Sequence, residues 1–285
     1  MNWPEALVRE LAERRCLIFL GSGASAGCVA KDGKSQPPTW EQFLLNLRGK
    51  MQCDVEKGVA QQLIDEKRFL EAAEIICADV AAPDFSQFIR ETFVTPKFNP
   101  STVHRVVLNI DPKVTITTNY DDIYDTFCRS GDAVDGYNVA RYYESHLVSD
   151  LRSPVRLIVK AHGCVSDPAR IVLTRSQYFA HRRDYGGFFR VLDALFLSSS
   201  LLFVGYSLSD PDIQLILENA SIAAPKAHPH YAIVSDDVHP ALKLSWAKAY
   251  NIHFLEYPAG DFGALDADLK RLAEEVIGFR ETHIA

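Results

Sequence analysis

Six short apolar runs recur along the chain, and their arrangement limits its fold more than any other feature. Each run has the length of a strand, and most are apolar at successive positions, as in strands buried on both faces of a parallel sheet. The later runs alternate with helical patterns, such as 210–220 and 240–250, each long enough for one crossover helix. The runs are CLIFL (16–20), VTIT (114–117), VRLIVK (155–160), SLLFVG (200–205), YAIVS (231–235) and IHFLEY (252–257). This pattern predicts an α/β protein with an open, doubly wound, mainly parallel Rossmann-like sheet.

Residues 39–108 interrupt the alternation. Only helical periodicity occurs between the first and second runs, which predicts an all-helical subdomain inserted into a single domain covering 1–285. The chain has no internal repeat and no Gly/Ser linker, so we expect the inserted helices to pack on the sheet. A later stretch, 131–153, mixes Gly, Tyr and Ser and is predicted to form loops beside the sheet.

Composition excludes several classes of protein. Apolar residues make up 47% of the chain, yet no stretch approaches the ~20 uninterrupted apolar residues of a membrane span. The N-terminal residues are charged where a signal peptide would be apolar, so we expect a cytoplasmic protein without a membrane partner. A net charge of −7 argues against direct nucleic-acid binding. The six cysteines form no C-x-x-C pair and are interpreted as reduced thiols.

A glycine-rich pattern, G-x-G-x-x-A, follows the first run directly at 21–26. Small residues there let the backbone approach a pyrophosphate, although the same pattern fits a tight turn. A dehydrogenase would add a second strand ending in an acidic residue about 20 residues further on. That distance falls on Glu41, inside a predicted helix, so the pattern favours a nucleotide-binding protein other than an ordinary dehydrogenase.

Polar groups follow two further runs. Residues 118–122 (TNYDD) come after VTIT, and His162 lies in the A-H-G segment after VRLIVK. Ligands bind at the carboxyl ends of the strands in an open α/β sheet, so we expect these groups to meet the glycine loop in one crevice. Two structural alternatives stay open: Asp121 or Asp122 could cap a helix, and His162 could be a buried, hydrogen-bonded histidine.

Another strand end carries Gly205 and Ser207 before a good helix start, with Ser209 or Asp210 as the capping residue. The G-x-S-x-G elbow of a serine hydrolase is absent because its second glycine is missing. His162 also precedes Ser207, the reverse of the usual order in that fold. We therefore assign Ser207 to contacting a ligand and not to nucleophilic attack.

In this order, GSGASAG, TTNYD, KAHG and FVGYS resemble the sirtuin catalytic core. The chain lacks the paired C-x-x-C zinc ligands and the I-P-D-F-R stretch of the protein deacylases in that family. It is more similar to the zinc-free, helix-rich bacterial sirtuin-like NAD hydrolases that serve antiphage defence by depleting NAD. The resemblance implies NAD contacts for Gly21, Ser22, Gly23, Ala24, Ser25, Thr118, Gly205 and Ser207.

The resemblance also implies the reaction, hydrolysis of the nicotinamide–ribose bond to give nicotinamide and ADP-ribose, with NAD as substrate and no metal. Asn119 would hold a ribose hydroxyl or the attacking water, and His162 would accept a proton. Asp121 would orient the Asn119 amide or favour the cationic transition state. Two alternatives stay open: an NAD-dependent protein deacylase, and a non-catalytic subunit that senses NAD or ADP-ribose.

Regulation follows from the same resemblance, because an ungated NAD hydrolase would harm its own cell. We expect a homo-oligomer, or a regulatory partner such as a hexameric motor ATPase or a short Argonaute. The helical insertion, 39–108, is the expected docking surface.

Overall fold

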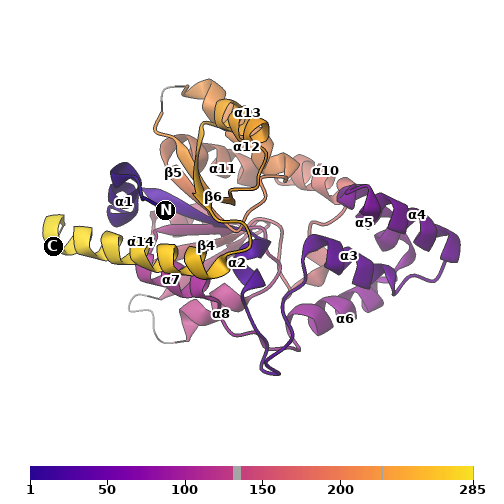
Figure 1. Ribbon diagram of the computed structural model, residues 1–285. Coiled ribbons are helices and arrows are strands. Elements are labelled where there is room, and N and C mark those ends of the chain that lie inside the picture. Colours follow the sequence, from indigo (N-terminus) through magenta and orange to yellow (C-terminus); the bar gives the residue numbers. More distant parts are fainter. Residues whose placement is uncertain (131–135, 226, 285) are drawn as a thin grey trace.

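A seven-stranded sheet forms the centre of the computed structural model, which describes residues 1–130, 136–225 and 227–284 (Figure 1). The strand order is β3-β4-β2-β1-β5-β6-β7, and every pairing between these strands is parallel. The strands are β1 (Cys16–Leu20), β2 (Val114–Thr117), β3 (Tyr137–Arg141), β4 (Arg156–Lys160), β5 (Ser200–Val204), β6 (His230–Ser235) and β7 (Ile252–Tyr257). The predicted open, mainly parallel α/β sheet is thereby confirmed.

The strands at the centre are buried on both faces, which explains their continuous apolar runs. In β1, Ile18 and Leu20 belong to one core while Leu17 and Phe19 belong to the other, since side chains alternate along a strand. Three helices, α1 (Glu5–Ala12), α7 (Thr102–Ile110) and α14 (Phe262–His283), cover the first face, and two, α11 (Gly186–Ser198) and α12 (Pro211–Ala223), cover the second. This is the doubly wound arrangement that the sequence predicts.

Helices surround the sheet on both faces (Figure 1). Across the described residues, none combines the length and apolarity needed to cross a membrane. The helical elements around the sheet are α1 (Glu5–Ala12), α2 (Ser22–Ala26), α7 (Thr102–Ile110), α8 (Ile123–Arg129), α9 (Leu147–Arg152), a 3-10 turn (Pro168–Arg170), α10 (Arg175–Asp184), α11 (Gly186–Ser198), α12 (Pro211–Ala223), α13 (Pro240–Tyr250) and α14 (Phe262–His283).

A separate cluster of four helices, drawn in purple in Figure 1, lies to one side of the sheet. It comprises α3 (Trp40–Arg48), α4 (Asp54–Asp65), α5 (Phe69–Asp79) and α6 (Ala82–Phe93). Its core also contains Tyr120 and Ile171, which belong to segments that follow β2 and β4, so the cluster is anchored to the carboxyl ends of the strands. Helix α7 falls within the range expected for the insertion but packs against α14 and α2 beside the sheet. Judged by its packing, the helical cluster therefore consists of α3, α4, α5 and α6.

The stretch predicted as loops, 131–153, contains strand β3 and helix α9, so that prediction is wrong for its described part. Residues 131–135 lie outside the described residues. Strand β3 occupies one edge of the sheet and is only partly buried. An edge strand needs no continuous apolar run, which is why its sequence, YNVAR, gives a weak signal.

The loop after β1 packs backbone to backbone on the turn after β5. The Gly23 amide donates a hydrogen bond to the Gly205 carbonyl at 2.9 Å, and the Gly21 amide donates to the Val204 carbonyl at 3.1 Å. Gly205 has φ +62°, and a Cβ on Gly23 would lie 2.8 Å from the Gly205 Cα. These glycines are therefore required by the contact between the two loops.

We predict that Gly205→Ala destabilises the protein more than Gly260→Ala. Both positions have positive φ, 62° and 75°, but a Cβ would clash with the Ala24 amide at Gly205 and meet no atom within 4 Å at Gly260. Backbone strain costs each variant about 1–2 kcal/mol, and overpacking adds about 1–3 kcal/mol at Gly205 alone. Urea unfolding of both variants measures the difference in the free energy of unfolding. Equal losses in the two variants would show that the contact between the loops does not constrain Gly205.

Candidate functional site

A cavity of about 620 Å³ opens at the carboxyl ends of β1, β2, β4 and β5 and is walled on its other side by residues of α3 and α5. Seven of the residues predicted from the sequence line it: Ser22, Ser25, Thr118, Asn119, Asp121, His162 and Ser207. Four others, Gly21, Gly23, Ala24 and Gly205, make the loop contact and are not part of the lining. A smaller cavity of about 310 Å³, next to Arg15 and Ser200, contains none of the predicted residues.

Asn119 is held in one orientation by three hydrogen bonds. Its Nδ2 donates to the Gly21 carbonyl at 2.9 Å and to Ser25 Oγ at 3.3 Å, and its backbone amide donates to Thr117 Oγ1 at 3.0 Å. A carbonyl can only accept, so the bond to Gly21 fixes which end of the side-chain amide is the nitrogen. The Asn119 side chain therefore offers its carbonyl oxygen as an acceptor to a ligand.

Asp121 is buried and is connected to Asn119 through Ser25. Its Oδ2 accepts a hydrogen bond from Ser25 Oγ at 3.0 Å, and its Oδ1 accepts one from the Ile123 amide at 3.1 Å. The second bond satisfies a first-turn amide of α8, as the capping alternative expected. The Asp121 carboxylate thus orders both a helix start and the serine that supports Asn119.

Lys160, the last residue of β4, is fully buried beneath these residues. Its Nζ donates to the Asp121 carbonyl and lies 3.6 Å from carboxylate oxygens of Asp122 and Asp125. Burial alone would lower the pKa of Lys160, but the charges of Asp125, Asp122 and Asp121 raise it. The ammonium therefore stays charged and ties the end of β4 to the segment after β2. Sequence reasoning missed this role, although a lysine closing an apolar strand was a visible signal.

His162 lies at the wall of the cavity and is 3% exposed. Its Nε2 is 3.4 Å from Asp210 Oδ2, its Nδ1 is 3.5 Å from the Tyr178 hydroxyl, and that hydroxyl donates to Asp210 Oδ2 at 2.8 Å. Burial lowers the pKa of His162, and the charge of Asp210 opposes this only in part. The imidazole is therefore neutral near pH 7 and can accept a proton.

Asp210 uses its two oxygens for different tasks. Oδ1 accepts hydrogen bonds from the amides of Asp212 at 2.9 Å and Ile213 at 3.2 Å, which caps α12 as expected for this helix start. Oδ2 faces Tyr178 and His162. The sequence predicted Asp210 as a helix cap but not its contact with Tyr178 and His162. That contact depends on the packing of α10 near α12, which no local sequence pattern indicates.

The lining of the cavity includes further polar and charged side chains. Ser207 and Ser209 hydroxyls lie 2.6 Å apart on one side. Lys67, Arg68 and Arg175 line the side formed by α5 and α10, and each is paired with a glutamate. Because each cation already has a glutamate partner, it would have to exchange that partner to bind an anionic ligand such as a phosphate ester.

A polar cavity at the strand ends of a doubly wound sheet is where many α/β proteins bind nucleotides, but several families share this architecture. Comparison with known families identifies which one: the family model described as SIR2-like domain matches residues 113–255, half of the chain. The chain belongs to the SIR2-like domain family.

Curated relatives share this region at low identity. The chain is 24% identical to the NAD(+) hydrolase ThsA of Acinetobacter baumannii over 226 residues, which is 76% of this chain and 42% of the relative. It is 28% identical to a protein of the same name from Enterococcus faecium over 133 residues, 46% of this chain and 27% of the relative. It is 22% identical to Defense-associated sirtuin 2 of Bacillus subtilis over 223 residues, 74% of this chain and 20% of the relative. The chain thus spans less than half the length of these relatives.

We predict that Asp210→Ala destabilises the protein by about 2–4 kcal/mol. The variant loses the α12 cap, about 1 kcal/mol, and leaves the buried Tyr178 hydroxyl without its acceptor, about 1–3 kcal/mol. Asp261→Ala is the matched control, because Asp261 caps α14 through Ala264 at an exposed position and should cost only the cap. Urea unfolding gives both values. Equal destabilisation would show that the contact with Tyr178 contributes nothing.

Proposed function

We propose that this chain is an NAD glycohydrolase that cleaves the nicotinamide–ribose bond and serves antiphage defence by depleting NAD. The observation that carries the proposal is that Asn119 and His162 line one cavity, although they lie 43 positions apart in the sequence. Relatives named NAD(+) hydrolase ThsA and Defense-associated sirtuin 2 support the same reaction and role.

The proposed reaction needs little beyond positioning and one proton acceptor. A water oxygen attacks the anomeric carbon of the ribose while the bond to nicotinamide breaks, and the bonding electrons neutralise the pyridinium. The carbonyl oxygen of Asn119 accepts a hydrogen bond from a ribose hydroxyl or from this water and so fixes the reacting atoms. Nicotinamide, ADP-ribose and one proton are the products.

His162 accepts that proton and later releases it to solvent. Burial keeps the imidazole neutral before the reaction because it lowers the pKa of His162. The Asp210 carboxylate, 3.4 Å from Nε2, then stabilises the imidazolium. Asp210 and Tyr178 act here as positioning residues.

The rest of the lining binds the dinucleotide in this proposal. Ser22, Ser25, Thr118 and Ser207 contribute polar groups, and a cavity of about 620 Å³ is within the usual size of ligand sites. Gly21, Gly23, Ala24 and Gly205 do not line the cavity; their mutual contact holds the glycine loop, and with it Ser22 and Ser25, in place. We propose no metal step for this reaction.

We predict that Asn119→Ala lowers nicotinamide release by about 100-fold or more, because the reacting atoms lose their positioning acceptor. Chromatography of nicotinamide formed from NAD measures the rate, and circular dichroism verifies the fold. Asn219→Ala, an exposed change on α12, is the control and should keep the wild-type rate.

We predict that His162→Ala lowers the rate by about 10²–10⁴-fold, the usual loss on removing a general base. His253→Ala changes an exposed histidine on β7 and should leave the rate unchanged. Folded Asn119→Ala and His162→Ala variants that both keep the wild-type rate would refute the proposed chemistry.

Product analysis separates this reaction from the two rivals. Hydrolysis yields nicotinamide and ADP-ribose without a peptide, whereas a deacylase needs an acylated peptide and yields an acylated ADP-ribose. A sensing subunit would bind NAD and release no nicotinamide. ADP-ribose formed from NAD and water alone supports the hydrolase.

We further propose that activity is gated in the cytoplasm by self-association or by a regulatory partner, such as a hexameric motor ATPase or a short Argonaute. The cluster α3–α6 is the proposed docking surface, because it forms its own core and borders the cavity. The relatives are more than twice as long as the region they share with this chain, so they have room for regulatory segments.

A further inference from the structure

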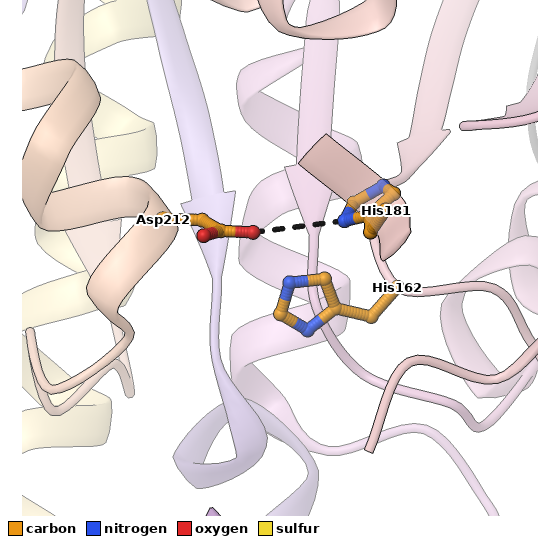
Figure 2. Close-up of side chains that lie close together, drawn as sticks. All are labelled: His162, His181 and Asp212. Atoms are coloured by element: carbon orange, nitrogen blue, oxygen red, sulfur yellow. Dashed lines mark ion pairs between the residues drawn. The ribbon is translucent and has the colours of Figure 1, made fainter. Parts of the chain in front are cut away.

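Two polar side chains that do not line the cavity lie close to His162. His181 comes from α10 and Asp212 from α12, and all three side chains point toward one another (Figure 2). One ring nitrogen of each histidine and one carboxylate oxygen lie within 4.8 Å of one another, and His181 Nδ1 is 3.6 Å from Asp212 Oδ2. Each of the three residues is at most 3% exposed.

The hydrogen bonding of this cluster is incomplete. Within the described part of the chain, neither ring nitrogen of His181 has a hydrogen-bond partner, and Asp212 Oδ2 has none either. Aromatic rings surround His181, among them Tyr142 at 4.3 Å and Phe189 at 4.8 Å between ring centroids. A buried polar group without a partner costs about 1–3 kcal/mol. For stability alone, an apolar side chain would suit this aromatic surrounding better than His181. The unpartnered nitrogens of His181 and the free oxygen of Asp212 therefore indicate a ligand-binding site.

The orientation of the Asp212 carboxylate indicates which ligand the cluster would bind. The Arg182 guanidinium donates to Asp212 Oδ1, which fixes the carboxylate and leaves Oδ2 facing His181. Two imidazoles and one carboxylate are a ligand set typical of Zn²⁺. Zinc lies about 2.0–2.2 Å from such ligands, which puts tetrahedral ligand atoms about 3.3–3.6 Å apart, so the 3.6 Å pair already fits and the widest pair must close by up to about 1.5 Å.

We propose that His162, His181 and Asp212 form a binding site for Zn²⁺, entered from the cavity past His162. This departs from the sequence-based expectation of no metal. Zinc would occupy an imidazole nitrogen of His162, which is the proton acceptor in the proposed reaction. The bound ion therefore inhibits NAD hydrolysis, an effect that rests on the proposed function. The site is thus an inhibitory one, distinct from a structural zinc ribbon.

Calorimetric titration of the metal-free full chain with ZnCl₂ tests the site without any assay of activity. We expect one tight site per chain, weakened at least 100-fold in His181→Phe, and no heat with MgCl₂, since magnesium prefers oxygen ligands. His146→Ala is the control, because His146 lies beside Glu144 and Asp150 at the surface and offers the obvious adventitious site. Wild-type protein without a tight site, or His181→Phe that binds like wild type, would overturn the proposal.

Folding is checked separately, since His181 is buried. If His181→Phe does not fold, Asp212→Asn takes its place, because it keeps the shape of the side chain and weakens a zinc ligand. Crystals soaked in ZnCl₂ should show an anomalous peak among the three side chains, and a peak only at His146 would contradict the assignment.

Activity then tests inhibition independently of binding. Zinc should lower nicotinamide release by the wild-type chain and have much less effect on His181→Phe, each relative to its own metal-free rate. A chain that binds zinc but never hydrolyses NAD would refute the proposed function and leave the metal site intact. A chain that hydrolyses NAD but lacks the tight site would refute only the metal site.

Discussion

The contact between the loop after β1 and the turn after β5 is the constraint on which the rest of the site depends. The Gly23 amide donates to the Gly205 carbonyl at 2.9 Å, and the two backbones are too close for a side chain between them. The Gly21 carbonyl in the same loop accepts the hydrogen bond that orients Asn119. A change that separated these loops would therefore also release Asn119.

Further hydrogen bonds carry the connection around the other strand ends. Ser25, in the glycine loop, donates to Asp121 after β2, and Lys160 at the end of β4 donates to the Asp121 carbonyl. Two residues beyond Lys160, His162 faces Asp210, which follows β5 and caps α12. The four strand ends thus form a closed ring around the cavity, which fixes both polar groups proposed to act on the ribose.

The sequence predicts the parts of this arrangement that depend on local pattern. Buried parallel strands are apolar at successive positions, so six strands were identifiable, whereas the half-buried edge strand β3 was not. Asn119 and His162 were found because parallel strands place their carboxyl ends together. The hydrogen bond from Tyr178 to Asp210 was not predictable, because it depends on how α10 packs near α12, and this tertiary contact leaves no periodic pattern in the sequence.

Asn119 and His162 are proposed to contact the same sugar of NAD. A crystal structure of a slow variant, His162→Ala, with NAD bound tests it most directly. We expect the nicotinamide ribose to lie between the Asn119 carbonyl oxygen and the position of the missing imidazole. NAD bound with that ribose outside the cavity, or with the adenosine end in its place, would contradict the proposed roles of both residues.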